Sequence, residues 1–139
     1  MRLLLVSPDR KPVVEARRRT GRRLKGAFPP LSLLQVAALT PPEWQVTVAD
    51  EAVEDAPLEL SCDLVGITAF TSSAPRAYEL AGAFRARGVP VVLGGMHASA
   101  CPEEALQHCD AVVVGEAEGA WPQALEDARA GRLRGVYRN

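Results

Sequence analysis

Short apolar runs alternate with amphipathic segments along most of the chain. Runs of strand length that are rich in β-branched residues are typical of buried parallel strands. Such runs predict five strands, at 2–6, 45–49, 63–68, 89–93 and 111–114. Val136-Tyr137 is a candidate for a further short strand. Helices are expected after Pro30, at 73–88, at 99–107 and before Gly131.

This order predicts an α/β domain with a doubly wound, five-stranded parallel sheet and helices on both of its faces. The length of 139 residues suits a single domain, 1–139. The chain ends directly after an expected strand, and we therefore expect it to be a fragment of a longer protein.

Two local patterns carry further expectations. In the helix after Pro30, Leu31, Leu34 and Ala38 are expected on the buried face, with Leu33 and Ala37 beside them. Residues 7–29 show no sustained periodicity and predict a long exposed loop, which in a compact domain is typically functional or disordered.

Composition excludes some classes of partner. Apolar residues make up 47% of the chain and the net charge is −1, so nothing indicates nucleic acid or a membrane surface as partner. No apolar run approaches the roughly 18 residues of a membrane span. The three cysteines form neither a CxxC pair nor an even framework, which favours a reduced, cytoplasmic location.

Charge is unevenly distributed. Eight of the sixteen basic residues lie between Arg10 and Lys25, and the segment from Asp50 to Asp63 carries six acids and no base. The basic segment is interpreted either as a solvated loop or as a contact for a neighbouring domain. Nucleic-acid binding is disfavoured because aromatic residues that stack on bases are missing there, apart from Phe28 at its end.

The carboxyl ends of the expected strands carry the candidate site. In a parallel sheet the loops after the strands meet at one edge, which we call the carboxyl edge, and ligands bind there. The loops at 7–11, 68–73, 94–99 and 115–118 are small, glycine-bearing and rich in hydroxyl groups. Gly94 and Gly95 either let a large ligand approach or form a plain turn.

Other kinds of site find less support. No GxGxxG or GxxxxGK[ST] motif is present, which counts against a nucleotide-binding domain. His97 and Cys101 are expected at the carboxyl edge and His108 and Cys109 at the opposite end of the sheet, so the four do not predict one metal site. Glu116 and Glu118 are equally consistent with ligand binding and with stabilisation of a helix N-terminus.

An ordered set of segments resembles a known family. The segments are Phe28-Pro29-Pro30-Leu31-Ser32-Leu33-Leu34, Val65-Gly66-Ile67-Thr68, Val91-Val92-Leu93-Gly94-Gly95-Met96-His97-Ala98, Pro102-Glu103-Glu104-Ala105-Leu106 and Asp110-Ala111-Val112-Val113-Val114-Gly115-Glu116-Ala117-Glu118. Together they resemble the N-terminal cobalamin-binding domain of cobalamin-dependent radical S-adenosylmethionine enzymes, of methyltransferase or cyclase type.

The resemblance implies a flavodoxin-like fold with cobalamin across the carboxyl edge and its nucleotide tail beside Gly94 and Gly95. It implies a barrel in the same chain that holds a 4Fe–4S cluster and S-adenosylmethionine. The CxxxCxxC motif of that barrel is absent here, so this chain is not expected to be catalytic alone. The implied cofactor-binding residues are Ser7, Pro8, Thr68, Ala69, Phe70, Thr71, Ser72, Gly94, Gly95, Met96, His97, Gly115, Glu116 and Glu118.

One departure from other cobalamin-binding domains bears on the cobalt. Many such domains carry DxHxxG after the first strand, whereas this chain reads Ser7-Pro8-Asp9-Arg10-Lys11-Pro12. The resemblance therefore implies cobalamin with its base displaced and without a protein imidazole on cobalt, and His97 is expected beside the tail instead. The alternative is a flavodoxin-like interaction domain that binds a protein partner without a cofactor, with Met96 filling the groove at Gly94 and Gly95.

Overall fold

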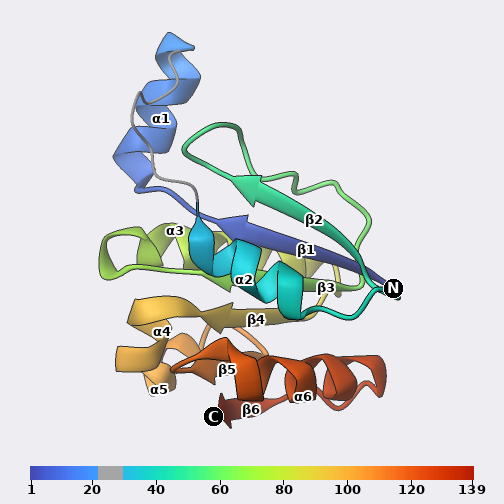
Figure 1. Cartoon of the computed structure of the whole chain (residues 1–139). Coiled ribbons are helices and arrows are strands. Elements are labelled where there is room, and N and C mark those ends of the chain that lie inside the picture. The colour runs from blue at the N-terminus through green and yellow to red at the C-terminus, as the bar shows by residue number, and fades with distance from the viewer. Residues whose placement is uncertain (22–29) are drawn as a thin grey trace.

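Six parallel strands form one sheet in the part of the chain that the structure, a computed structural model, describes: residues 1–21 and 30–139. The strand order is β2-β1-β3-β4-β5-β6 (Figure 1). The strands are β1 (Arg2–Ser7), β2 (Gln45–Asp50), β3 (Leu64–Thr68), β4 (Val91–Gly94), β5 (Ala111–Val114) and β6 (Gly135–Arg138). The helices are α1 (Lys11–Thr20), α2 (Leu31–Leu39), α3 (Ala74–Ala86), α4 (Gly95–Ala100), α5 (Pro102–Ala105) and α6 (Ala117–Arg129), with a 3-10 turn at Thr71–Ser73.

The expected flavodoxin-like architecture is confirmed, but the number of strands is not. All five expected strands are present, and a sixth, β6, pairs with β5 from Ala111↔Gly135 to Val114↔Arg138. Its burial alternates between half-buried and exposed residues, as expected of a strand at the edge of a sheet. A four-residue run of this kind is too short for its periodicity to be decisive.

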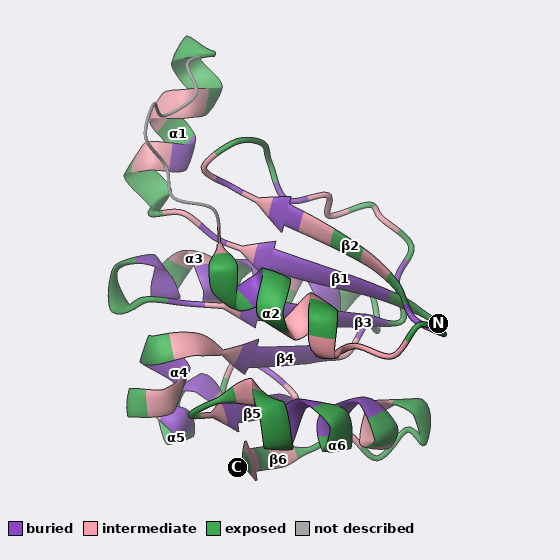
Figure 2. Cartoon of the chain, in the orientation of Figure 1, coloured by how far each residue is buried: buried purple, intermediate pink, exposed green. Residues whose placement is uncertain are grey.

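Alternate residues of the central strands feed two cores on opposite faces of the sheet. On one face, Leu3, Leu5 and Val92 pack under α2 and α6, which contribute Leu33 and Trp121. The other face is covered mainly by α3, α4 and α5, and its core includes Val65, Leu80, Phe84, Leu93 and Ala105. Figure 2 shows the consequence, because β1, β3 and β4 are buried along most of their length.

Helix α2 presents a different face to the sheet from the one expected. Leu31 and Leu34 are exposed, whereas Leu33 is buried and Val36 and Ala37 pack against the core. Both faces of this helix are apolar, so the sequence pattern alone does not distinguish the buried one. The prediction that Leu31 and Leu34 lie on the buried face is therefore wrong.

The expected loop at 7–29 contains a helix. Within its described part, residues 7–21, helix α1 runs from Lys11 to Thr20 and ends at Gly21, whose φ of 66° is the left-handed conformation typical of a helix C-cap. Val14 is the buried residue of this helix, which explains the missing periodicity. The expectations for Arg22, Arg23 and Phe28 lie outside the described residues.

Two short helices are present where a single helix at 99–107 was expected, and the first of them begins earlier in the chain. Helix α4 begins at Gly95, directly after β4, and α5 follows from Pro102. Cys101 separates the two helices, because Pro102 disfavours helical backbone in the residue before it and Cys101 adopts φ −130° and ψ 57°. The result places His97 and Cys101 on a helix and its end rather than in a loop.

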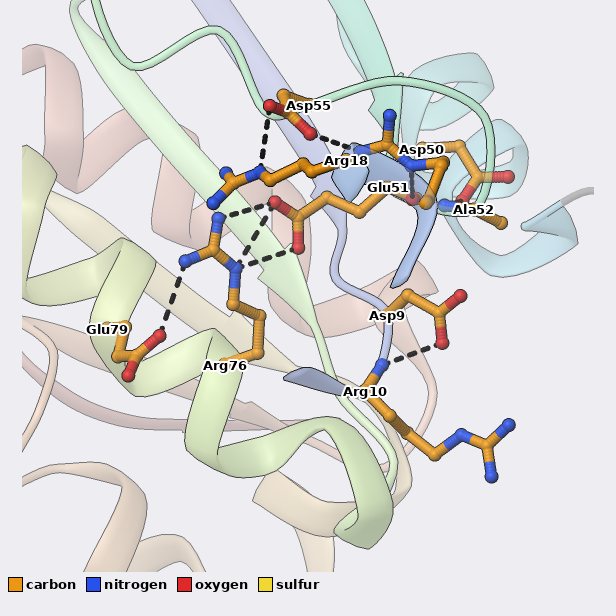
Figure 3. A network of polar contacts seen from close by, with 10 residues as sticks. Asp9, Arg10, Arg18, Asp50, Glu51, Ala52, Asp55, Arg76 and Glu79 are labelled. Atoms are coloured by element: carbon orange, nitrogen blue, oxygen red, sulfur yellow. Dashed lines mark hydrogen bonds and ion pairs between the residues drawn. The ribbon is translucent and has the colours of Figure 1, made fainter. Parts of the chain in front are cut away.

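The basic and acidic segments meet in space. Arg17 and Arg18 of α1 pair with Asp55, and Lys11 pairs with Glu79 of α3. Arg76 of α3 contacts both carboxylate oxygens of Glu51, the residue directly after β2 (Figure 3). Arg17 and Arg18 of the basic segment therefore have an acidic partner, Asp55, within the same chain.

Candidate functional site

Three neighbouring strands carry a glycine where each approaches the carboxyl edge. Gly66 of β3, Gly94 of β4 and Gly115 after β5 follow Leu64, Val92 and Val113 by two residues. Because side chains alternate along a strand, these glycines belong to the face covered by α2 and α6. The missing side chains leave a hollow between the sheet and the two helices.

This hollow, which we call the glycine cavity, has a volume of about 120 Å³. Leu5, Val92 and Val113 of the sheet line it, together with Leu33 of α2 and Trp121 of α6. Ser32, Gln35, Thr68 and Glu116 supply its polar groups. A complete small-molecule pocket measures about 300–1,000 Å³. The glycine cavity therefore suits one apolar ring system of a ligand whose remainder lies outside.

The protein's own structure does not require glycine at position 94. Its φ of −146° is extended backbone that any residue adopts. A Cβ built on it would lie 3.8 Å from the Val113 carbonyl oxygen, which is ordinary contact. The open space at this position is thus available to a ligand.

Polar contacts join the two helices beside the glycine cavity. The Gln35 side-chain amide of α2 donates to the Glu118 carboxylate of α6. The Trp121 indole N–H donates to the Thr40 hydroxyl across 2.9 Å, which fixes the ring at the inner side of the cavity. The Ser99 hydroxyl accepts the Gly115 N–H at 3.0 Å and ties the loop after β5 to α4. These contacts hold the cavity walls without occupying its interior.

The residues expected at the site divide into two groups. Thr68, Gly94, Gly95, Gly115 and Glu116 line the glycine cavity. The remaining expected residues lie outside the cavity lining. Met96 and His97 are in α4, Glu118 is in α6, Thr71 and Ser72 are in the 3-10 turn, and the others are at a strand end or in the loop that follows it: Ser7, Pro8, Ala69 and Phe70. Met96 is 72% exposed and does not fill the groove beside Gly94.

The deeper lining of the cavity was not predicted from the sequence: Leu5, Leu33, Gly66 and Trp121. Side chains that line a cavity follow the same apolar pattern along a strand or helix as side chains of the core. One feature of the sequence could have indicated this part of the cavity: Gly66 interrupts an otherwise apolar strand.

The two histidines lie at a separate cluster on the α3 side. The Tyr78 ring stacks on His108, with centroids 3.9 Å apart, and its hydroxyl lies 2.9 Å from Nε2 of His97. Burial and the hydrogen bond that Tyr78 donates to Glu104 raise the pKa of the tyrosine. Hydrogen bonds from Tyr78 and His97 lower the pKa of Glu104. Cys109, which follows His108 in the chain, is buried, and burial raises the pKa of its thiol to about 11.

No helix in the described part of the chain is both long and apolar enough to cross a membrane.

Three known proteins are similar to this chain. It is 44% identical over 108 residues to bacteriochlorophyllide d C-8(2)-methyltransferase of Chlorobaculum tepidum, a match that covers 77% of this chain and 24% of the relative. It is 36% identical over 111 residues to bacteriochlorophyllide d C-12(1)-methyltransferase of the same organism, covering 78% and 24%. An uncharacterized methyltransferase of Pyrococcus horikoshii is 32% identical over 151 residues, covering 98% and 31%.

The chain thus spans about a quarter to a third of the length of these relatives. The family model for the B12 binding domain matches residues 20–125, which include α2, the glycine-bearing strand ends and most of α6. The match agrees with the expectation drawn from the ordered segments of the sequence. The chain belongs to the B12-binding domain family.

Proposed function

We propose that this chain is the cobalamin-binding module of a longer radical S-adenosylmethionine methyltransferase. The three relatives are methyltransferases by name, and each is three to four times the length that the chain covers. The remainder of the longer protein would supply the barrel, the 4Fe–4S cluster and the substrate site. Two relatives are named for a bacteriochlorophyllide, so methylation of a tetrapyrrole carbon is the reaction that we propose for the full-length enzyme.

The glycine cavity carries this proposal. Its apolar walls and its volume of about 120 Å³ fit the aromatic base of the nucleotide tail, and its opening lies beside Gly94 at the carboxyl edge. Leu33, Gly66 and Trp121 would hold the base. The loops that contain Ser7, Pro8, Thr68–Ser73 and Gly115–Glu118 would support the corrin, which is too large to enter the cavity.

We further propose that no protein imidazole occupies the lower face of cobalt. The segment between β1 and α1, from Ser7 to Arg10, holds no histidine. His97 directs Nε2 to Tyr78 and Glu104 and places Nδ1 3.2 Å from the Thr71 hydroxyl. Tyr78 of α3 and Glu104 of α5 belong to the face of the sheet opposite the glycine cavity, so His97 is directed away from that cavity. When bound, cobalamin would supply the chemistry of methyl-group transfer, and the residues of this chain would hold and orient it.

The alternative, an interaction domain without cofactor, predicts a groove closed by the protein's own side chains. The exposed Met96 does not close it, and Gly94 leaves it open. These two observations favour the cofactor module.

The decisive experiment is retention of hydroxocobalamin. The purified chain is mixed with the cofactor and desalted, and the visible spectrum is recorded. A retained corrin spectrum with the bands of displaced-base cobalamin is expected. A retained spectrum of base-on cobalamin would contradict the tail in the glycine cavity.

The same test on a chain extended past Asn139 distinguishes the remaining cases. Retention by the extended chain alone would show that the corrin needs the following domain. Lack of retention by both chains would contradict the cofactor module and favour the interaction domain.

A further inference from the structure

Three side chains with metal-binding atoms converge at the junction of α4 and α5. His97 lies in α4, Cys101 at the break between the two helices and Glu104 in α5, so the three are close in the chain but not on one continuous helix. Their ligand atoms all lie within 4.8 Å of one another. The cluster uses the α3 side of the sheet, whereas the glycine cavity lies under α2 and α6.

His97 is held as a metal-binding histidine is usually held. Its side chain is buried, and Nδ1 lies 3.2 Å from the Thr71 hydroxyl oxygen. Nε2 lies 3.3 Å from a Glu104 carboxylate oxygen. A hydrogen bond from one ring nitrogen commonly orients a histidine whose other nitrogen binds a metal. Thr71 is placed to do this for His97.

Cys101 differs from the buried Cys109. The Cys109 thiol lies 3.2 Å and 3.1 Å from the carbonyl oxygens of Ala105 and Ala111, as a structural cysteine does. Cys101 is half-buried at the break between two short helices, and among the described residues its thiol has no hydrogen-bond partner. Its side chain is thus free to turn toward His97 and Glu104.

The Tyr78 hydroxyl contacts two of these three residues, His97 and Glu104. It lies 2.9 Å from His97 Nε2 and donates to Glu104 across 2.9 Å. When a carboxylate binds a metal through one oxygen, a hydroxyl donor of this kind fixes its orientation. Tyr78 is therefore a positioning residue at this cluster.

We propose that His97 Nε2, Cys101 Sγ and the Glu104 carboxylate bind a divalent cation of the zinc class. One nitrogen, one sulfur and one oxygen donor suit Zn²⁺ better than Mg²⁺ or Ca²⁺, which prefer oxygen ligands alone. Tetrahedral coordination with bonds of about 2.0–2.3 Å places ligand atoms about 3.3–3.8 Å apart. The His97–Glu104 pair already has such a separation, and a rotation of Cys101 brings the third ligand into place.

Binding of the cation changes the protonation of one of the residues at this cluster. The Cys101 thiol loses its proton to solvent when the sulfur binds the cation. In the cation-bound form His97 would carry its one proton on Nδ1, which then donates to the Thr71 hydroxyl. The Nε2 lone pair would face the cation, in place of the hydrogen bond between Nε2 and Glu104. Tyr78 remains protonated and continues to donate to Glu104. Binding therefore releases one proton for each cation, and the fourth coordination position is left to water.

The test uses the untagged, cobalamin-free chain after treatment with a chelator. Co²⁺ is titrated as a spectroscopic probe and then displaced by Zn²⁺, whose affinity is measured by competition with a chromophoric chelator. One Co²⁺ per chain is expected, with a near-ultraviolet thiolate-to-cobalt charge-transfer band that disappears when Zn²⁺ is added. Absence of this band would overturn the proposal, whether or not cobalamin binds.

Matched variants locate the site. Cys101→Ser is expected to abolish the charge-transfer band, and Glu104→Gln to weaken Zn²⁺ binding at least about tenfold. Cys62→Ser and Glu103→Gln are expected to bind as the unmodified chain does. Far-ultraviolet circular dichroism checks that each variant is folded. An unchanged band in Cys101→Ser, or its loss in Cys62→Ser, would overturn the assignment.

Discussion

Gly94 and Gly95 are neighbours in the chain, but the protein's own structure requires glycine only at Gly95. Gly95 has a φ of 90°, and a Cβ there would lie 2.5 Å from the Thr68 hydroxyl oxygen and 3.0 Å from the Ala69 nitrogen. Gly94 is extended and has room for a Cβ. The first glycine of the pair is therefore available for ligand binding, whereas the second shapes the turn into α4.

Gly94→Val is expected to weaken cobalamin retention without unfolding the domain. The branched side chain would fill the opening of the glycine cavity, and overpacking of about 1–3 kcal/mol corresponds to about 5- to 150-fold weaker binding. Retention is measured from the corrin absorbance after desalting. The free energy of unfolding is expected to change by less than about 1 kcal/mol. Gly82→Val, on the exposed face of α3 with no atom within 4 Å of a Cβ, is the matched control.

Gly95→Ala is expected to destabilise the fold itself. An alanine at positive φ, in contact with the Thr68 hydroxyl and the Ala69 backbone, costs about 1–3 kcal/mol of unfolding free energy. Urea unfolding followed by circular dichroism measures this cost. An alanine variant as stable as the unmodified chain would show that the backbone adapts here. Cofactor loss in a Gly95 variant therefore reports on the turn and not on the tail.

Glu51→Gln is expected to lower the free energy of unfolding by about 3–5 kcal/mol. The Glu51 side chain is fully buried and lies 2.7–3.2 Å from the Arg76 guanidinium. Removal of its charge leaves the nearly buried Arg76 with only the more exposed Glu79 carboxylate as an anionic partner. Glu79→Gln removes a carboxylate that is 41% exposed and contacts the same arginine, and it is expected to cost less than about 1 kcal/mol. Equal losses in the two variants, measured by urea unfolding, would contradict this account.

The contact between α1 and Asp55 is expected to weaken in acid. Burial alone raises the pKa of Asp55, but the hydrogen bond from Arg17 and the charges of Arg18 and Arg17 outweigh it and lower the pKa. A lowered pKa stabilises the fold above the unfolded value of about 3.9, and this stabilisation is lost as the pH falls through the folded pKa. Asp55→Asn is therefore expected to cost less than about 1 kcal/mol at pH 7 and nothing below the folded pKa.

Urea unfolding of both chains between pH 3 and pH 7 tests this expectation. A difference that persists unchanged in acid would show that Asp55 contributes through something other than its charge. The same difference is expected to shrink in about 1 M salt, because the pair is half-exposed and therefore screened.

Cys109 is expected to resist alkylation in the folded chain. Burial raises the pKa of its thiol to about 11, so at pH 8 only about 0.1% of it is thiolate, the reactive form. The half-buried Cys101 is expected to react first with iodoacetamide in the presence of a chelator, as followed by mass spectrometry of peptides. In urea the three cysteines are expected to react at similar rates. Native Cys109 that reacts as fast as Cys101 would contradict the burial.

Much of the fold followed from patterns within single segments. The apolar runs that became β1, β3, β4 and β5 are buried on both faces, so nearly every residue in them is apolar and the assignment needs no tertiary knowledge. Helix α1 did not follow, because charged contacts to Asp55 and Glu79 rather than an apolar face hold it. The buried side of α2 did not follow either, because that helix is apolar on both sides.

The candidate site could likewise be predicted only in part from the sequence. Gly94, Gly95, Gly115 and Thr68 could be named from the sequence, because residues after parallel strands share one edge whatever the rest of the chain does. The opposite roles of Gly94 and Gly95 could not, since they depend on φ and on the distance to Thr68. The same holds for His97, Cys101 and Glu104, whose convergence depends on the break that Pro102 introduces between α4 and α5.

The strands, their parallel arrangement and the edge that carries the candidate site could be predicted from the order of residues, because they depend on local hydrophobicity and on connections between successive elements. Which glycines leave space and which turn the chain depends on the folded arrangement. So does the pairing of Arg17 and Arg18 with Asp55. Such properties depend on distances between atoms far apart in the chain, and the order of residues does not contain those distances explicitly.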